Sequence, residues 1–326
     1  MLQDVTALIG NVQKFCTEDG PGIRSTIFFK GCPLNCQWCH NPEMIKPRNQ
    51  MIVNPKKCIK CMECIKACPS HSIKVNEGGP VINQTQCDIC QRCSIVCFAN
   101  AILPVAAEMT VNEVMEIIRQ DKLFYETTNG GITLSGGEVL MQHEFAQNII
   151  EACAKENVDV CLDTSGFAPF KIIEELCEYK NVTTILYDVK HIDDKKHKQY
   201  TGACNVLILE NLRRLAANYK TAPKIWLRMP LISNVNDDDE TIKKTGEFYQ
   251  ECGLRKVSLI AFHSLGKSKA EHIGDNYIEF KPPSNARLER IKSYFESICM
   301  NVEIVGRNQL SKEMYLEKGE TDDSKK

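Results

Sequence analysis

Eighteen cysteines in a chain of 326 residues constrain this protein more than any other feature of its sequence. Three of them lie within residues 32–39, and eight more lie within residues 58–97. Cysteines separated by only two residues are too crowded for a disulfide framework, and secreted disulfide scaffolds are usually shorter than about 100 residues. We therefore expect a reduced, cytoplasmic chain that binds metal through thiolates.

The overall composition is that of a globular protein without a strong charge field. Hydrophobic residues make up 43% of the chain, charged residues make up 25%, and the formal net charge is −2. A chain without a basic excess is not typical of nucleic-acid binding. We find no apolar run of about 18 residues, which a membrane span would need. Residues 1–4 also lack the basic and apolar regions of a signal peptide. We expect neither nucleic acid nor membrane as a partner.

Short apolar runs alternate with helical patterns along most of the chain. We expect strands at residues 25–29, 132–134, 159–162, 184–187, 225–227 and 257–260. Residues 110–113 form a capping-box pattern that begins a helix extending to about residue 124. This alternation predicts an α/β fold with a parallel sheet covered by helices. Because these units are too few for a closed eight-unit barrel, we expect a partial (β/α)6 barrel.

Residues 53–104 differ in character from the rest of the chain. They are rich in Cys, Lys, Asn and Pro and contain only short strand-like pieces, at 72–75 and 80–82. We interpret them as an inserted α+β domain. The chain then divides into the start of the barrel at 1–52, the insert at 53–104, the remainder of the barrel at 105–310 and a polar C-terminal tail at 311–326.

Most of the polar groups that stand out in this sequence follow directly after the expected strands. In barrels of this type the functional site is built at the carboxyl ends of the strands. The sequence therefore predicts one site formed by residues 32–39, 135–138, 163–166, 188–191, Arg228 and His263.

The first cysteine group has the spacing C-x3-C-x2-C, formed by Cys32, Cys36 and Cys39. Three thiolates can hold three irons of a [4Fe–4S] cluster and leave the fourth iron open to a substrate. On spacing alone, a zinc site that uses His40 as the fourth ligand remains an alternative.

This first group resembles the signature C-x3-C-x-aromatic-C of the radical S-adenosylmethionine (SAM) enzymes, with Trp38 at the aromatic position. The context at residues 20–24 (Gly-Pro-Gly-Ile-Arg) and 41–42 (Asn-Pro) is similar to that of glycyl radical enzyme activating enzymes, and the resemblance covers about residues 8–308. It implies that SAM chelates the open iron, that one electron breaks a sulfonium C–S bond, and that the resulting 5′-deoxyadenosyl radical takes a glycine hydrogen from a partner protein. The three cysteines are then the catalytic residues, and Trp38, Cys39 and His40 belong to the cofactor-binding set.

The eight cysteines of the insert form two copies of the bacterial ferredoxin pattern. The fourth cysteine of each copy ligates the other cluster in two-cluster ferredoxins. We therefore assign one [4Fe–4S] cluster to Cys58, Cys61, Cys64 and Cys97, and a second to Cys87, Cys90, Cys93 and Cys68. Phe98 stands where the pattern usually has proline, and we expect it to alter a turn. The sequence leaves three roles for these eight cysteines: clusters that transfer electrons, clusters that only stabilise the insert, and zinc sites in place of clusters.

The resemblance also assigns SAM contacts at the other strand ends. The segment Gly136-Gly137-Glu138 resembles the one that holds the SAM amino group, and its carboxylate can accept hydrogen bonds from an ammonium. His263 resembles a family histidine near SAM. The alternative for the Gly136-Gly137-Glu138 segment is a plain turn, and the alternative for His263 is a histidine without a role in SAM binding.

Four further polar residues complete the expected pocket. Asp163 and Ser165 end one strand, and their alternative role is a helix cap. Asp188 and Lys190 lie two residues apart and therefore point to the same side of the next strand, with Lys190 suited to the SAM carboxylate. The resemblance implies that Asp163 and Asp188 also help to bind a monovalent cation. Arg228 would contact SAM or the substrate backbone, or else form a surface ion pair.

The implied partners are a glycyl radical enzyme and a low-potential electron donor such as flavodoxin or ferredoxin, and we expect a monomer. Asp19, Gly20 and Arg24 are candidates to contact the partner's glycine loop. The insert points away from the formate-lyase type and towards dehydratase, decarboxylase, or C–C or C–N lyase partners. A radical SAM enzyme acting on a small molecule, an electron carrier and a zinc-binding module remain as alternatives.

Overall fold

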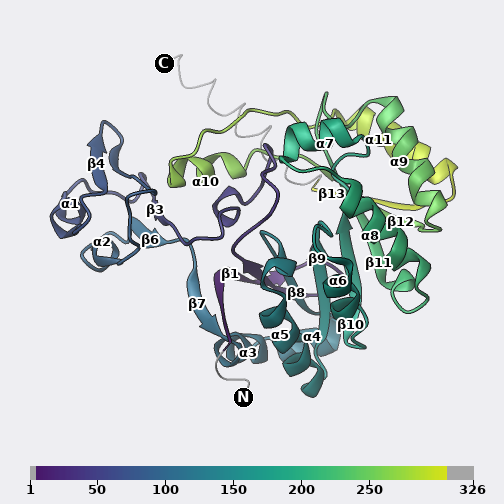
Figure 1. Ribbon diagram of the computed structural model, residues 1–326, viewed down its shortest axis with the longest axis horizontal. Helices are drawn as coiled ribbons and strands as arrows, with labels where there is room; N and C mark the ends of the chain where they lie inside the picture. The colour runs from purple at the N-terminus through teal and green to yellow at the C-terminus, as the bar shows by residue number, and fades with distance from the viewer. Residues whose placement is uncertain (1–4, 307–326) are drawn as a thin grey trace, which may run out of the picture.

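The structure, a computed structural model, describes residues 5–306, and its largest element is a nine-stranded sheet (Figure 1). The strands follow the order β13-β12-β11-β10-β9-β8-β2-β1-β7. Neighbours from β2 to β13 are parallel, whereas β1 runs antiparallel to both β2 and β7. The bounds are β1 (Thr6–Cys16), β2 (Arg24–Phe29), β7 (Ala107–Thr110), β8 (Gly131–Gly136), β9 (Asp159–Thr164), β10 (Val182–Asp188), β11 (Ile225–Leu231), β12 (Lys256–Ala261) and β13 (Asn301–Val305).

The expected strands all form, as β2 and β8 to β12, and they pair in the order of the sequence. The prediction of an α/β fold with a mostly parallel sheet is therefore confirmed. The strands β1, β7 and β13 were not expected from the sequence. In β1, buried residues alternate with exposed or half-exposed ones such as Gln13 and Lys14, so the strand has no continuous apolar run that would mark it.

Helices separate the parallel strands along the chain and pack on the sheet (Figure 1). The capping box at Thr110 and Glu113 forms as expected, but the helix ends at Arg119. The carboxylate of the buried Asp121 turns inward and accepts a hydrogen bond from Ser25 Oγ at 2.9 Å, and a new helix begins after it. The helices are α3 (Val111–Arg119), α4 (Lys122–Thr128), α5 (His143–Lys155), α6 (Phe170–Cys177), α7 (Asp194–Thr201), α8 (Val206–Ala217), α9 (Asp239–Glu251), α10 (Gly266–Ile273) and α11 (Asn285–Ser297), with short 3₁₀ turns η1 (Pro42–Met44), η2 (Val139–Gln142) and η3 (Ala222–Lys224).

The core of the molecule lies between the sheet and these helices. Ile27, Leu134, Val160, Ile185 and Leu227 come from five neighbouring strands and are completely buried in it. Burial of this apolar surface is the main source of stability for the sheet. The sheet is therefore a rigid base for the loops that follow its carboxyl ends.

Residues 51–104 form a smaller unit beside the main sheet, seen at the left of Figure 1. It has its own core, in which Cys64, Cys68, Cys87 and Cys93 pack with apolar side chains such as Met51. The strand-like pieces expected at 72–75 and 80–82 form a hairpin. The elements are β3 (Met51–Val53) paired with β6 (Ile102–Pro104), β4 (Ile73–Asn76) paired with β5 (Gly79–Ile82), α1 (Glu63–Ala67) and α2 (Arg92–Ile95).

Among residues 5–306, no helix combines the length and apolar character that crossing a membrane requires. The tail expected at 311–326 lies outside the described residues.

Candidate active site

A cavity of about 620 Å³ opens at the carboxyl ends of the parallel strands. Parallel strands bring their carboxyl ends to one edge, so residues far apart in sequence meet there. Of the expected site residues outside the insert, Glu138 is the exception and does not line the cavity. The others all do: Cys32, Cys36, Trp38, Cys39, His40, Gly136, Gly137, Asp163, Ser165, Asp188, Lys190, Arg228 and His263.

The three cysteines of the first group lie on the loop that follows β2, and backbone hydrogen bonds fix this loop. Cys32 N donates to Ile45 O at 2.8 Å, and Cys39 N donates to Cys36 O at 3.0 Å. The ring of Trp38 is almost completely buried and lies 5.8 Å from the ring of Tyr200, between centroids. The loop is therefore held at its start by Ile45, by an internal turn at Cys36–Cys39 and by its aromatic residue, and its thiols line the cavity.

Burial changes the acidity of all three thiols in this group. Burial raises the pKa of Cys39 to about 12, and it also raises the pKa values of Cys32 and Cys36 above their ordinary value. Thiolates here need compensating positive charge, which bound iron would provide.

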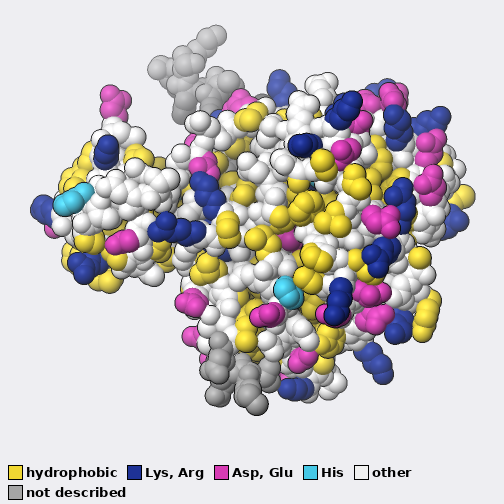
Figure 2. All heavy atoms as spheres, in the orientation of Figure 1, with side chains coloured by type: hydrophobic (Ala, Val, Ile, Leu, Met, Phe, Trp, Pro, Cys, Tyr) yellow, Lys and Arg dark blue, Asp and Glu magenta, His cyan; other side chains and the backbone are white. Residues whose placement is uncertain are grey.

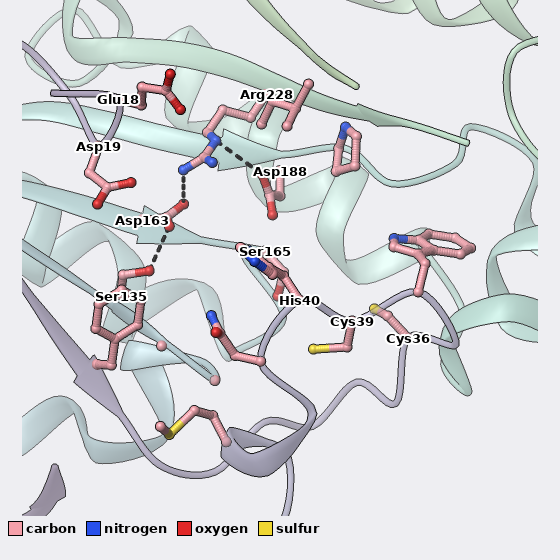
Figure 3. Close-up of a pocket in the computed structure, with 18 of the residues that line it drawn as sticks. Glu18, Asp19, Cys36, Cys39, His40, Ser135, Asp163, Ser165, Asp188 and Arg228 are labelled. Carbon is pink, nitrogen blue, oxygen red and sulfur yellow. Dashed lines mark hydrogen bonds and ion pairs between the residues drawn. The ribbon is translucent and has the colours of Figure 1, made fainter. Parts of the chain in front are cut away.

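A row of charged side chains crosses the cavity next to the cysteine loop (Figure 3). Ser135 Oγ donates to Asp163 Oδ2 at 2.7 Å, and Arg228 Nη1 lies 3.1 Å from Asp163 Oδ1. Arg228 Nε lies 3.8 Å from Asp188 Oδ1, and Lys190 Nζ donates to Asp188 Oδ2 at 2.7 Å. The register of the sheet causes this, since Asp188 and Arg228 are paired residues on β10 and β11.

The charges in this row stabilise one another away from water. Burial raises the pKa of Asp163, and the neighbouring Arg228 opposes that rise. Burial would lower the pKa of Lys190, but Asp188 and the nearby thiols outweigh it and hold the pKa above its ordinary value. Asp188 Oδ1 is buried and accepts no hydrogen bond. That oxygen still lies 3.8 Å from Arg228 Nε, so a charged ligand in the cavity would meet a row whose charges are already paired with one another.

Glu138 has a different environment from the one expected for a ligand of an ammonium group. Its buried carboxylate accepts hydrogen bonds from Thr164 Oγ1 at 2.6 Å, from Ser165 N at 2.9 Å and from Ser165 Oγ at 2.5 Å. It also accepts one from Leu140 N at 3.3 Å. The carboxylate joins the loop after β8 to the loop after β9, and the backbone of the two glycines, not this side chain, faces the cavity.

Gly137 allows the loop after β8 to lie against the cysteine loop. An added Cβ at this position would lie 2.2 Å from Gly31 O, and that oxygen accepts a hydrogen bond from Glu138 N at 2.8 Å. Any larger residue would push the two loops apart. The glycine therefore has a packing role in addition to its position in the cavity.

His40 and His263 both line the cavity and pack edge to face, with 4.0 Å between ring centroids. Burial, followed by the charge of His263, lowers the pKa of His40 to about 3. The imidazole of His40 is therefore neutral at physiological pH and can offer only an uncharged nitrogen to a ligand.

Arg24, expected at the partner interface, is a structural residue. Its guanidinium is buried and donates to Thr133 Oγ1 at 2.8 Å and to Pro21 O at 2.9 Å.

Asp19 does line the cavity, and its carboxylate accepts a hydrogen bond from Thr26 Oγ1 at 2.6 Å. Sequence reasoning missed Phe15 and Glu18, which also line it, because β1 itself was not expected.

The eight cysteines of the insert surround two small cavities. The sets are those expected to share a cluster: Cys58, Cys61, Cys64 and Cys97 line the first insert cavity, and Cys68, Cys87, Cys90 and Cys93 line the second. Backbone N–H groups point at several of these sulfurs, as around iron–sulfur clusters; examples are Ala101 N to Cys97 Sγ at 3.2 Å and Lys60 N to Cys58 Sγ at 3.4 Å. All eighteen cysteines of the chain lie within the described residues, and all are free thiols.

Comparison with known proteins identifies the family. The family model of the Radical SAM superfamily matches residues 85–245, and that of a 4Fe-4S single cluster domain matches residues 18–92. The trans-4-hydroxy-L-proline dehydratase activating enzyme of Clostridioides difficile is 40% identical over 304 residues, which cover 92% of this chain and 99% of that relative. This chain belongs to the glycyl radical enzyme activating enzymes. The choline trimethylamine-lyase activating enzyme of Oleidesulfovibrio alaskensis is 37% identical, over 92% of this chain and 98% of that relative.

A radical SAM methyltransferase from Sphaerobacter thermophilus has a similar fold, with a TM-score of 0.54 and 14% identity over 91% of this chain and 76% of that chain. Membership of the activating enzymes means that the chain uses an iron–sulfur cluster and SAM. It favours this activity over a small-molecule radical SAM enzyme, an electron carrier or a zinc-binding module.

Proposed function

We propose that this activating enzyme holds a [4Fe–4S] cluster on Cys32, Cys36 and Cys39, binds SAM at its open iron, and forms a glycyl radical in a partner enzyme. The observation that carries the proposal is the joint lining of one cavity by three half-buried thiols and the charged row of Asp163, Arg228, Asp188 and Lys190. When bound, the cluster and SAM supply one electron and a 5′-deoxyadenosyl radical that removes the glycine hydrogen.

The chain's own residues bind and orient the ligands. Lys190 and Arg228 are half-buried cations beside the cysteine loop and match the carboxylate of SAM. Backbone groups of Gly136 and Gly137 are suited to its amino group, while Glu138 positions the loop that carries them. Asp188 Oδ1, together with Asp163, is the acceptor that a monovalent cation would use.

Trp38, His40, Ser165 and His263 complete the cavity wall. Trp38 packs its ring against Tyr200 and keeps water from the cysteine loop. Because the chemistry is hydrogen-atom transfer, the contribution of these residues is orientation and exclusion of water.

The open sheet would be a partial barrel with a lateral opening between its ends. Cavity-lining residues come from both sides: Phe15 and Asp19 at the end of β1, and Val305 and Gly306 at the end of β13. We propose that the glycine loop of the partner enters here, with the barrel formed by residues 1–52 and 105–310.

The insert at 53–104 would be a ferredoxin-like domain with two further [4Fe–4S] clusters, which makes three in the chain. The four-cysteine lining of each insert cavity supports this assignment. Because these clusters would have no open iron, we propose that they accept electrons from flavodoxin or ferredoxin. So many cysteines without a disulfide among the described residues also favour a reduced compartment, the cytoplasm, and we propose a monomer.

The two relatives described above are named as activating enzymes of a dehydratase and of a trimethylamine-lyase. We propose that the partner of this chain is a glycyl radical enzyme of the dehydratase, decarboxylase or lyase kind.

The test is an anaerobic incubation of the reconstituted protein with SAM, reductant and candidate partner enzymes. The proposal predicts a glycyl radical EPR doublet in one partner. The doublet should disappear with Cys36→Ala and persist with Cys204→Ala, since Cys204 is exposed and outside every cysteine set described here. A full-strength doublet with Cys36→Ala would contradict the assignment.

A further inference from the structure

The insert has an exposed apolar surface that the proposed chemistry does not use. Phe98 is 91% exposed, Ile95 is 81% exposed and Ile59 is 67% exposed. Phe98 is the most exposed large hydrophobic side chain within the described residues. It stands where the ferredoxin pattern usually has proline, so the position carries an aromatic ring that the fold of the insert leaves in water.

One of these residues lines the first insert cavity, and the other two are next in sequence to residues that line it. Ile59 lines the cavity itself, and Phe98 lies between Cys97 and Ala99, which also line it. Ile95 is the last residue of α2 and directly precedes Val96, another residue of the cavity wall. The apolar surface is therefore centred on the cysteine set of Cys58, Cys61, Cys64 and Cys97.

Exposed lysines adjoin this surface in the sequence. The insert contains six Lys and Arg against three Asp and Glu, a net charge of +3 in a chain whose total is −2. Lys56 and Lys57 are exposed directly before Cys58, and Lys60 follows Ile59. Figure 2 shows hydrophobic side chains and Lys or Arg side chains together on the insert, at the left of the view. The acid closest in sequence, Glu63, forms an ion pair with Lys66 at 2.7 Å.

An apolar centre with a basic rim is the complement of an acidic protein surface. We propose that the patch formed by Ile59, Ile95, Phe98, Lys56 and Lys57 docks an acidic electron-carrier protein. This inference rests on the proposed function, because it names where the electron donor binds. Charge complementarity steers the acidic partner to the insert, and burial of the Phe98 ring holds it there.

The charge of the patch also disfavours some partners. A basic protein meets like charges from Lys56 and Lys57. The glycyl radical enzyme has its own opening at the carboxyl edge of the barrel sheet, lined by residues such as Phe15 and Val305, and does not need the insert patch. Docking on the insert therefore leaves the barrel opening free for the partner's glycine loop.

The binding test uses isothermal titration calorimetry of an FMN-loaded acidic flavodoxin against the reconstituted, iron-loaded holoenzyme. The double variant Lys56→Glu/Lys57→Glu should weaken binding by about tenfold or more, since reversed charges repel the carrier. Phe98→Ala should weaken it by about tenfold, because an exposed aromatic residue at the centre of an interface is a typical hot spot. Iron content is measured for every variant to show that the insert remains loaded.

Matched controls lie on the barrel. Lys171→Glu reverses a charge at a side chain that is 85% exposed, and Tyr219→Ala removes an aromatic ring that is 82% exposed. Both should bind flavodoxin within about twofold of the wild type, and raising the salt concentration should weaken wild-type binding. Basic cytochrome c, used as a comparison protein, should not bind.

The docking proposal would be overturned if both patch variants, with full iron content, bound flavodoxin as tightly as the wild type. It would also be overturned if cytochrome c bound as tightly as flavodoxin. A change in self-association on Phe98→Ala without a change in flavodoxin affinity would overturn it as well. The proposed function fails on a separate measurement. SAM cleavage by the wild type with dithionite needs no docked protein, so its absence would overturn the radical SAM assignment whatever the calorimetry shows.

Discussion

Replacing Glu138 tests whether this carboxylate holds two loops together or binds SAM directly. Its oxygens accept hydrogen bonds from Thr164, Ser165 and Leu140 in a buried site. In Glu138→Ala the hydroxyl groups can rotate to other acceptors, so the two backbone N–H groups determine the cost. Each buried unsatisfied group costs about 1–3 kcal/mol. We therefore expect Glu138→Ala to lower the free energy of unfolding by about 2–5 kcal/mol.

Glu138→Gln is the more discriminating change. It keeps one acceptor oxygen but turns an amide donor towards the remaining N–H and O–H groups, so we expect a loss of about 1–2 kcal/mol. The assay is anaerobic urea unfolding of the reconstituted protein, together with the dissociation constant of SAM. Glu144→Gln, at an exposed acid on the neighbouring helix α5, is the control and should change neither quantity.

The result that would refute this reasoning is specific. If Glu138→Gln unfolds like the wild type while its SAM affinity falls about tenfold, the carboxylate meets the ammonium of SAM, since one lost charge-assisted hydrogen bond has about that effect. If stability falls and the remaining folded protein binds SAM with an affinity close to that of the wild type, the loop-joining role is supported.

Three further predictions concern a buried arginine, two buried histidines and the iron content. Arg24→Ala should lower the free energy of unfolding by about 3 kcal/mol in urea titrations, because the guanidinium joins buried groups of β8 and the loop before β2; unchanged stability would contradict the structural role. Burial lowers the pKa values of His191 and His197, so the unfolded chain binds more protons and stability should fall as pH drops below about 6.5, by up to about 1.4 kcal/mol per pH unit for each histidine. His197→Gln should reduce that slope between pH 7.5 and 5.5, and an unchanged slope would contradict the prediction. Iron analysis should give about twelve irons per wild-type chain and about eight for Cys36→Ala; about four irons in the wild type would contradict three clusters.

Much of the fold is predictable from local sequence patterns. The strands β2, β8, β9, β10 and β12 are mostly buried along their length, so they appear in the sequence as short apolar runs such as residues 25–29. The strands β1 and β13 alternate buried and more exposed residues and contain polar or charged positions such as Gln13 and Glu303. Their pairing depends on neighbours distant in sequence, which a local pattern does not reveal.

The cavity was predictable because its residues follow strand ends, and parallel strands bring their carboxyl ends together. The direction of each side chain was not predictable in the same way. Glu138 follows the strand as expected, yet its carboxylate turns to the donors of Thr164 and Ser165. Arg24 lies in a motif with functional resemblance, yet it is buried against Thr133. Spacing indicates which edge a residue occupies, whereas the available hydrogen-bond partners decide where it points.

Electron–nuclear double resonance on the reduced holoenzyme tests the central claim most directly. SAM labelled with ¹⁷O in its carboxylate and ¹⁵N in its amino group would be added to the reduced protein. We predict hyperfine coupling of both nuclei to a cluster, abolished in Cys36→Ala and retained in Cys204→Ala. Absence of coupling in a wild-type sample saturated with SAM would contradict the account, because no iron at Cys32, Cys36 and Cys39 would then be open to the ligand.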